Sequence, residues 1–327
     1  MGAPPTLDPD GLVLARLPAP ISSETTRLAV LSDVHIATEA EGTDRLFHRT
    51  EDRLATAVDR LNRSEPDLVL FCGDLTKDGE PWNFDRFDEL VAALDPPHVV
   101  TPGNHDVPKS SDEHRTPAVA AFERRYTPGS LPLVERVGGI DLVVCNSASL
   151  PDGSLSDTHE GEVSGEQLSW LEETLPRLSN PVVAIHHNVV PVMGSALANR
   201  PPWRTFTLRN REAVSSLLAR YDVPLVISGH HHVPSLARRS GITQLIAPAA
   251  CAYPQAHLLL EIDPSGTTVR MIPHADRDQQ LEAYEAMQAN ELRRVFRSLV
   301  GATIETAPVV DEPSQPSLEP AGSYAQP

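Results

Sequence analysis

Short apolar runs of Val, Leu and Ile recur along the middle of the chain, between about residues 27 and 273. They do not alternate with polar residues, and a continuous apolar run of this length is typical of a strand buried on both faces. The runs cover residues 28–31, 68–72, 99–100, 140–145, 182–185, 225–227, 243–246, 258–262 and 269–272. We therefore predict a strand at each of them.

Helical spacing appears between several of these runs. Apolar residues share one helical face over residues 54–61, 168–178 and 217–221. Ser164 followed by Gln167 has the spacing of a capping box, which predicts that the second of these helices begins there. Strands alternate with helices early in the chain and follow one another later, so the pattern predicts an α/β layered fold with mixed, packed sheets.

The two ends of the chain differ from its middle. Residues 1–26 form a Pro-rich N-terminal extension with one short strand predicted at residues 12–17. Residues 276–304 are charged and helical in pattern, and we predict a C-terminal helical extension there. Residues 305–327 are rich in Pro, Ser, Glu and Ala, a composition that predicts a disordered tail. Residues 27–275 remain as one domain.

Composition and charge exclude several classes of partner. The formal net charge of the 327-residue chain is −18, which makes nucleic acid or an anionic membrane an unfavourable partner. No apolar run approaches the ~18 residues of a membrane span. The cysteines, Cys72, Cys145 and Cys251, form no CxxC pair. They are predicted to be reduced thiols of a cytoplasmic protein.

Metal-binding residue types follow five of the predicted strands. In open α/β folds, ligands gather outside the carboxyl ends of the strands, so these side chains are expected to meet at one rim. Carboxylate, amide and imidazole ligands suit a Mn, Fe, Co or Zn ion. Because no cysteine is among them, a structural zinc site is not expected. The residues concerned are Asp33, His35, Asp74, Asn104, His186, His230 and His232.

These residues fall into five blocks that, in this order, resemble the calcineurin-like metallophosphoesterases. The blocks are Asp33-x-His35, Gly73-Asp74, Gly103-Asn104-His105-Asp106, His186-His187 and Gly229-His230-x-His232. The resemblance covers about residues 27–273. It implies a metallophosphoesterase domain, built as a four-layer α-β-β-α sandwich of two packed mixed sheets flanked by helices.

The resemblance also implies the roles of the residues in these blocks. Two divalent transition-metal ions (Mn, Fe, Zn or Co) would share Asp74 as a bridge, and a metal-bridging hydroxide would attack the phosphate ester. His105 would protonate the leaving oxygen or stabilise its charge, and Asp106 would pair with or orient nearby groups. One ion would have Asp33, His35, Asp74 and His232 as ligands, and the other Asp74, Asn104, His186 and His230.

Further motifs narrow the branch of the superfamily. Residues 73–81 and 161–171 look like the class III cyclic nucleotide phosphodiesterase and glycerophosphodiesterase group. The resemblance implies a small-molecule phosphodiester, such as a cyclic nucleotide, as substrate, and a homodimer as an assembly. The chain departs from the group at Asn146 and Asn188, on segments expected to line the substrate side. A phosphomonoesterase remains the main alternative. The acidic charge disfavours a nuclease, and the retained His105 disfavours a non-catalytic scaffold.

Other histidines and arginines have weaker support. His187 and His231 occupy positions of the blocks that do not supply ligands in the family, so both are expected to stay outside the ligand set. His159, Arg200 and Arg204 lie on segments from which they could reach the substrate, although solvated loop positions are the simpler interpretation.

Overall fold

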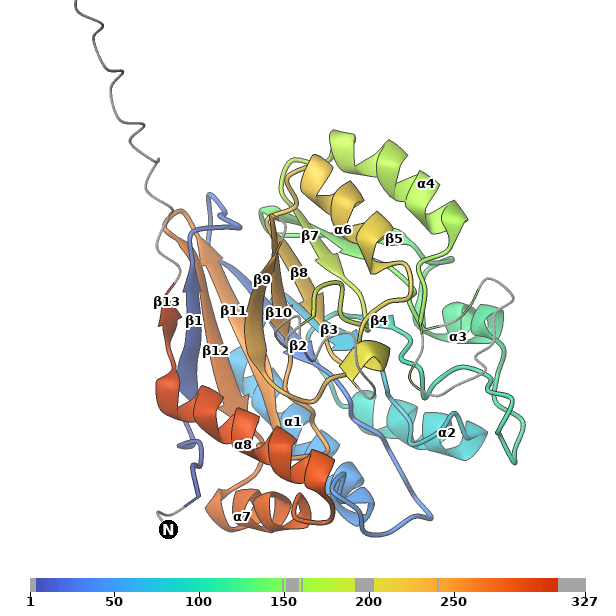
Figure 1. Ribbon diagram of the computed structural model, residues 1–327, viewed down its shortest axis with the longest axis vertical. Coiled ribbons are helices and arrows are strands. Elements are labelled where there is room, and N and C mark those ends of the chain that lie inside the picture. Colours follow the sequence, from blue (N-terminus) through green and yellow to red (C-terminus); the bar gives the residue numbers. More distant parts are fainter. Residues whose placement is uncertain are drawn as a thin grey trace, which may run out of the picture.

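The computed structural model describes residues 4–148, 150, 159, 161–191, 203–239 and 241–310. Two β-sheets lie face to face in it (Figure 1). The first sheet has the strand order β13-β1-β12-β11-β2-β3-β4, in which β2, β3 and β4 are parallel and β11 runs antiparallel to β2. Its strands are β1 (Leu12–Leu17), β2 (Thr26–Leu31), β3 (Leu68–Cys72), β4 (His98–Thr101), β11 (Ala256–Asp263), β12 (Gly266–Pro273) and β13 (Val309–Val310).

The second sheet has the order β5-β6-β7-β8-β10-β9. Its four central strands, β6, β7, β8 and β10, are parallel, and an antiparallel strand closes each edge. Both sheets are therefore mixed. The strands are β5 (Leu133–Val137), β6 (Ile140–Val144), β7 (Pro181–Ala184), β8 (Leu225–Ser228), β9 (Ser235–Arg239) and β10 (Ile242–Ile246).

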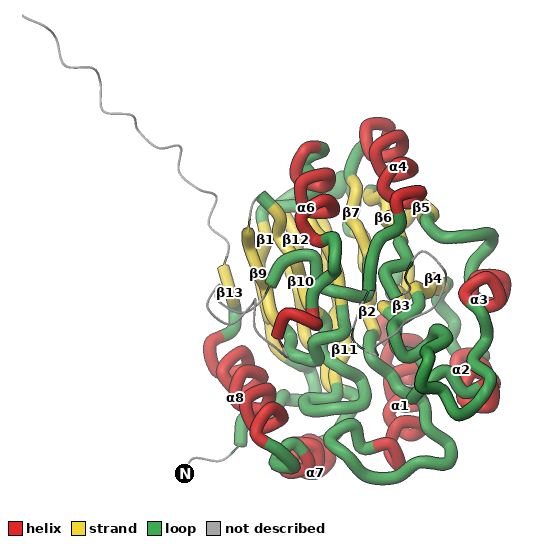
Figure 2. The backbone as a smooth tube through the Cα atoms, turned by 45° about the vertical axis from the view of Figure 1, so that its right-hand side comes forward, coloured by secondary structure: helices red, strands yellow, loops and turns green. Residues whose placement is uncertain are grey.

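Helices cover the outer faces of both sheets (Figure 2). The first sheet is covered by α1 (Thr50–Ser64), α2 (Pro81–Val91) and α3 (Val119–Tyr126), and the second by α4 (Gly165–Thr174) and α6 (Arg211–Arg220). Helices α7 (Arg277–Ala286) and α8 (Glu291–Thr306) pack together at one end of the molecule. Single 3₁₀ turns occur at η1 (Phe47–Arg49), η2 (Leu175–Arg177) and η3 (Trp203–Phe206).

The central strands are buried on both faces, as their unbroken apolar runs predict. In β2, Leu28 and Val30 face the core between the two sheets, whereas Ala29 and Leu31 face the helices on the outside. Burying a side chain such as Leu or Val stabilises the fold by roughly 1.5–3 kcal/mol. The two sheets and their helical layers confirm the predicted α-β-β-α sandwich.

The predicted strands are confirmed, with boundaries that differ by a few residues. The pattern missed β5 and β9, because both are edge strands whose exposed positions carry polar residues. The start predicted for the C-terminal tail, residue 305, is too early. Helix α8 continues to Thr306, and β13 pairs with β1. The rest of that predicted tail, residues 311–327, lies outside the described residues.

No helix among the described residues has the length and apolar character needed to cross a membrane. The three cysteines are buried free thiols. Burial raises the pKa of Cys72 and of Cys145, so both stay protonated at neutral pH.

Candidate metal centre

The carboxyl ends of strands from both sheets open at one edge of the sandwich. Asp33 follows β2, Asp74 follows β3 and Asn104 follows β4 in the first sheet. His186 follows β7 and His230 follows β8 in the second sheet. The carboxyl ends of the parallel strands of both sheets therefore lie at the same edge of the sandwich. This is where the strand pattern predicts a ligand site.

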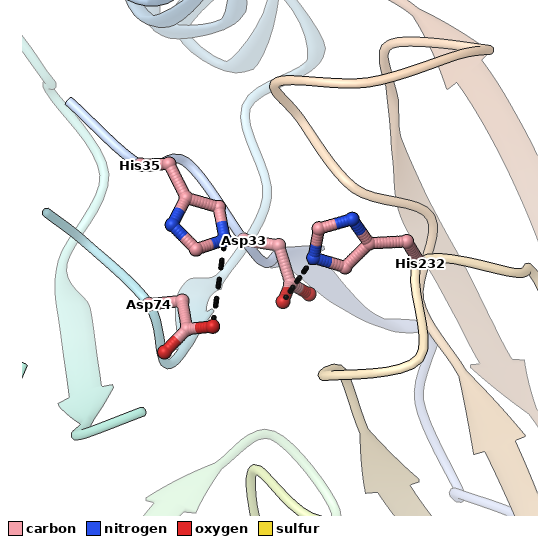
Figure 3. Close-up of side chains that lie close together, drawn as sticks. All are labelled: Asp33, His35, Asp74 and His232. Atoms are coloured by element: carbon pink, nitrogen blue, oxygen red, sulfur yellow. Dashed lines mark ion pairs between the residues drawn. The ribbon is translucent and has the colours of Figure 1, made fainter. Parts of the chain in front are cut away.

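One group of candidate ligands lies on the side of the first sheet. The carboxylate oxygens and imidazole nitrogens of Asp33, His35, Asp74 and His232 all lie within 4.8 Å of one another. Nε2 of His35 is 3.4 Å from Oδ2 of Asp74, and Nε2 of His232 is 3.1 Å from Oδ1 of Asp33. Figure 3 shows both imidazoles directed at these carboxylates.

The second group shares Asp74 with the first. Asp74, His186 and His230 also lie within 4.8 Å through their ligand atoms. Nε2 of His186 is 3.4 Å from Oδ2 of Asp74 and 3.0 Å from Oδ1 of Asn104. Nδ1 of His186 is 2.8 Å from the carbonyl oxygen of Cys72. Because a carbonyl can only accept, Nδ1 carries a proton, and Nε2 is the nitrogen turned toward Asp74.

The spacing of these atoms fits two metal ions. Ligand atoms about 2.0–2.2 Å from one ion lie about 3–3.5 Å apart in tetrahedral or octahedral geometry. The measured separations of 3.0–3.4 Å fall in this range. Nε2 of His35 and Nε2 of His230 are buried and have no hydrogen-bond partner among the described residues. Such nitrogens are costly in a protein interior unless an ion uses their lone pairs.

Strained backbone surrounds the same residues. Asp33, His35, Asp74, His230 and His232 all have positive φ, between 49° and 66°. A residue with a Cβ in this left-handed region costs about 1–2 kcal/mol. Such strain persists only where the surrounding structure imposes it, and it clusters at functional sites. The strained backbone therefore lowers the stability of the fold, but it holds these side chains in place.

Glycines allow the loops that carry the candidate ligands to approach one another closely. A Cβ at Gly73 would collide with the ring of His186, and one at Gly103 would collide with the carboxylate of Asp74. Gly161, which lies outside the motif blocks, has the same constraint against the ring of His187.

The electrostatics of the centre call for positive charge. Burial would raise the pKa of Asp74, but the imidazoles of His186 and His105 outweigh it, and the net pKa is lowered. Burial would lower the pKa of His186, but the carboxylates of Asp74 and Asp33 raise it to about 9. Burial holds the pKa of His230 well below its usual value. The carboxylate of Asp74 is therefore anionic at neutral pH and attracts a cation.

Comparison with known proteins identifies the family. The family model described as calcineurin-like phosphoesterase matches residues 26–234. The chain belongs to the calcineurin-like phosphoesterase family. The chain is therefore a metal-dependent hydrolase of phosphoric esters.

Relatives of this phosphoesterase include bacterial enzymes. It is 30% identical over 235 residues to a cAMP/cGMP dual specificity phosphodiesterase of Mycobacterium tuberculosis, covering 68% of this chain and 66% of that protein. It is 30% identical over 240 residues to a 3′,5′-cyclic adenosine monophosphate phosphodiesterase of Pseudomonas aeruginosa, covering 71% and 79%. A dimetal phosphatase structure from Danio rerio shares the fold, with a TM-score of 0.56, 16% identity, and coverage of 76% and 99%.

A buried ion-pair network holds His105 at the centre of the phosphoesterase. Nδ1 of His105 is 3.2 Å from Oδ1 of Asp78, which in turn is 3.3 Å from Nζ of Lys109. Lys109 also contacts Asp112, and Nζ donates to the carbonyl of His105. Asp78 therefore fixes the ring of His105 with Nε2 toward the cavity. The sequence motifs did not single out Asp78.

We expect the substitution Asp78→Asn to lower kcat without loss of metal. The amide keeps the shape but removes the charge beside Nδ1 of His105, which is 3.2 Å away. The expected loss in kcat is about tenfold to a hundredfold, part of the ~10²–10⁴ that general acid catalysis supplies. Steady-state kinetics across pH would show the change. Asp112→Asn is the matched control, because Asp112 pairs with Lys109 but does not touch His105. An equal loss of kcat in both variants would assign Asp78 a structural role only.

Asp106 ties two of the loops together. Its buried carboxylate accepts hydrogen bonds from the backbone N–H groups of Leu75, Thr76 and Gly103, all at 3.0 Å. Burial and the charge of Asp74 raise the pKa of Asp106 to about 6. The residue holds the loop after β3 against the loop after β4, and so orients Asp74 and Asn104 rather than His105.

A cavity of about 70 Å³ opens onto the candidate ligands. The residues with weaker support from the sequence take different places with respect to it. His159 lines it, whereas Arg204 is exposed on η3 and is absent from its wall. Arg200 lies outside the described residues. Sequence analysis missed the other side chains of the wall, which are Arg45, Phe206, Leu292, Arg293 and Phe296.

The wall of this cavity does not include His187, His231, Asn146 or Asn188. Nδ1 of His187 is 3.0 Å from Oγ of Ser147, and His231 packs against Phe296. Asn146 lines a different cavity, and the Asn188 carboxamide accepts a hydrogen bond from Ser228 at 2.7 Å. Neither Asn146 nor Asn188 lies in the wall of the metal cavity, and their place on the substrate side stays a prediction.

Proposed function

We propose that this phosphoesterase hydrolyses a small-molecule phosphodiester, a 3′,5′-cyclic nucleotide or a similar compound. The observation that carries the proposal is the pair of ligand groups that share Asp74. Two of its relatives are named as cyclic nucleotide phosphodiesterases, which supports this substrate class. A phosphomonoester is the second candidate, supported by the two arginines in the wall of the cavity.

The chain's residues divide the work between binding and proton transfer. Asp33, His35, Asp74 and His232 would hold one divalent cation, and Asp74, Asn104, His186 and His230 the other. Two such cations, when bound, act as Lewis acids toward phosphate oxygens and lower the pKa of water to about 7. His105 faces the same cavity and would give a proton to the departing oxygen, while Asp78 holds its other nitrogen.

A panel assay tests the substrate class. Protein loaded with manganese is offered 3′,5′-cyclic AMP, an aryl phosphodiester and an aryl phosphomonoester. The proposal expects turnover of both diesters, with the cyclic nucleotide giving the larger kcat/KM. Exclusive turnover of the monoester would replace the proposal with the second candidate. No turnover of any ester by protein that holds two metals per chain would refute both.

The cytoplasm is the compartment that we propose, because the three cysteines are buried free thiols and none is paired. The metal identity among Mn, Fe, Zn and Co, and the homodimer, stay predictions of the family resemblance. Elemental analysis of the purified protein and its mass in solution check them.

A further inference from the structure

One wall of the metal cavity comes from a part of the chain that the family model does not match. Leu292, Arg293 and Phe296 of α8 line the cavity, and the matched region ends at residue 234. In Figure 1, α8 is the red helix that runs along one end of the molecule beside α7. The spacing i, i+1 and i+4 places the three side chains on one side of the helix. The C-terminal helical extension is therefore part of the site.

A second arginine reaches the cavity from the segment before η1. Nη2 of Arg45 is 3.4 Å from Nε2 of His105. Nδ1 of His105 faces Asp78, so Nε2 is the nitrogen that lies beside Arg45. Nε of Arg45 is buried and has no hydrogen-bond partner among the described residues. Among the described residues, no carboxylate forms an ion pair with Arg45. Arg45 therefore brings an unbalanced positive charge to the cavity.

Arg293 is positioned by contacts with Asp44 and Phe296. Its Nε lies 3.2 Å from Oδ2 of Asp44, a residue with 8% exposure. The guanidinium also lies over the ring of Phe296, 5.6 Å from the centroid. Because Nε is turned toward Asp44, the terminal amino groups are the donors that can meet a ligand. A pre-positioned guanidinium of this kind loses little conformational freedom on binding a phosphate.

The charge of the cavity wall favours a ligand with two negative charges. Two divalent cations, when bound, would outweigh the carboxylates of Asp33 and Asp74, and Arg45 adds a further positive charge near His105. A phosphodiester carries one negative charge, whereas a phosphomonoester carries close to two near neutral pH. Hydrolysis of a diester makes this second charge: water adds to phosphorus, the ester P–O bond breaks, one proton of the water goes to the alcohol oxygen, and the other is released to solvent.

We propose that Arg45 and Arg293 form an anion-binding pair that holds a dianionic phosphomonoester. This inference rests on the proposed function, in which that group is the product of phosphodiester hydrolysis. It makes this phosphoesterase sensitive to inhibition by its own product. The pair should also bind a phosphomonoester more tightly than a phosphodiester that carries the same organic substituent.

The test compares phosphate binding with diester turnover in the full chain loaded with manganese. The variants are Arg45→Met and Arg293→Met, with Arg294→Met as the matched control. Arg294 is the next residue of α8, is exposed, and does not line the cavity. Titration calorimetry with inorganic phosphate at about pH 8, where it is mostly a dianion, gives Kd. Steady-state kinetics with bis(4-nitrophenyl) phosphate, a monoanion, gives KM.

The pair predicts a rise in the Kd for phosphate of about tenfold to a hundredfold in each cavity variant, and a rise in KM of less than about threefold. The control should match the unaltered chain. A Kd within about twofold of the unaltered chain in both cavity variants would overturn the pair. Equal weakening of phosphate and diester would overturn the assignment to a dianion.

Two further measurements keep the outcomes apart. Arg293→Met leaves Asp44 without its partner, so thermal unfolding is recorded for each variant. Arg293→Lys keeps a positive charge beside Asp44 but loses the paired N–H donors of the guanidinium. It should give a Kd for phosphate between those of the unaltered chain and Arg293→Met. An unaltered chain that holds metal, binds phosphate and turns over no diester would refute the proposed function. The phosphate titrations would still decide whether the arginines form the pair.

Discussion

The substitution Asp74→Asn is expected to release metal and to abolish phosphodiester hydrolysis. Asp74 belongs to both ligand groups, with Oδ2 at 3.4 Å from Nε2 of His35 and at 3.4 Å from Nε2 of His186. The amide removes the negative charge and one oxygen ligand. Even residues that only support metal ligands are worth roughly 10–100-fold in metal affinity, so the loss here should exceed about a hundredfold. Elemental analysis and kcat/KM measure it.

A matched control separates metal loss from damage to the fold. Asp67 lies just before β3, at the opposite end of the strand from Asp74, and accepts a hydrogen bond from the backbone of Arg27. Asp67→Asn should keep the metal content and activity of the unaltered chain. If Asp74→Asn kept two metals per chain and near-normal turnover, Asp74 would not be the bridging ligand.

The second large effect is expected for His105→Ala, which should keep both metals and lose most turnover. The side chain of His105 lines the cavity with Nε2 available to a ligand, whereas its Nδ1 faces Asp78. Its removal takes away the group that we propose gives a proton to the leaving oxygen. The expected loss in kcat is about 10²–10⁴-fold.

The leaving group provides the sharper measurement for His105. An ester of a poor leaving group, such as an alkyl alcohol, needs a proton more than an ester of 4-nitrophenol does. The loss in kcat should therefore be larger for the alkyl ester. An equal loss for both esters would mean that His105 stabilises charge and does not transfer the proton. Unchanged kcat with both would remove His105 from the reaction altogether.

The candidate ligands could be predicted because they follow apolar strands directly. In a parallel sheet the carboxyl ends meet at one edge, so Asp33, Asp74 and Asn104 are brought together by the order of β2, β3 and β4 alone. The glycines beside them add a second signal. Each of Gly73 and Gly103 sits where a Cβ would collide with a candidate ligand.

The cavity wall could not be predicted in the same way. Arg45 precedes a short 3₁₀ turn and Arg293 lies on a helix near the end of the chain, so neither follows a strand. Their approach to His105 and Asp44 depends on how α8 packs, which no local pattern encodes. Gln167 shows the same limit on a smaller scale. Ser164 caps α4 as predicted, but the side chain of Gln167 turns away to the backbone of Asn146.

Asp78 shows why the neighbours of a motif matter. It lies on the loop that follows the Gly73-Asp74 block, and the sequence assigned the pairing role to Asp106 instead. The backbone hydrogen bonds of Asp106 give that residue a different task, since they leave its carboxylate buried between two loops. Only the folded arrangement separates the two carboxylates.

Anomalous diffraction from crystals of the manganese-loaded chain tests the central claim most directly. The account predicts two peaks about 3.5–4 Å apart, with the carboxylate of Asp74 between them. One peak should contact Asp33, His35 and His232, and the other Asn104, His186 and His230. A single peak elsewhere, or none at these residues in crystals that contain the metal, would contradict the account.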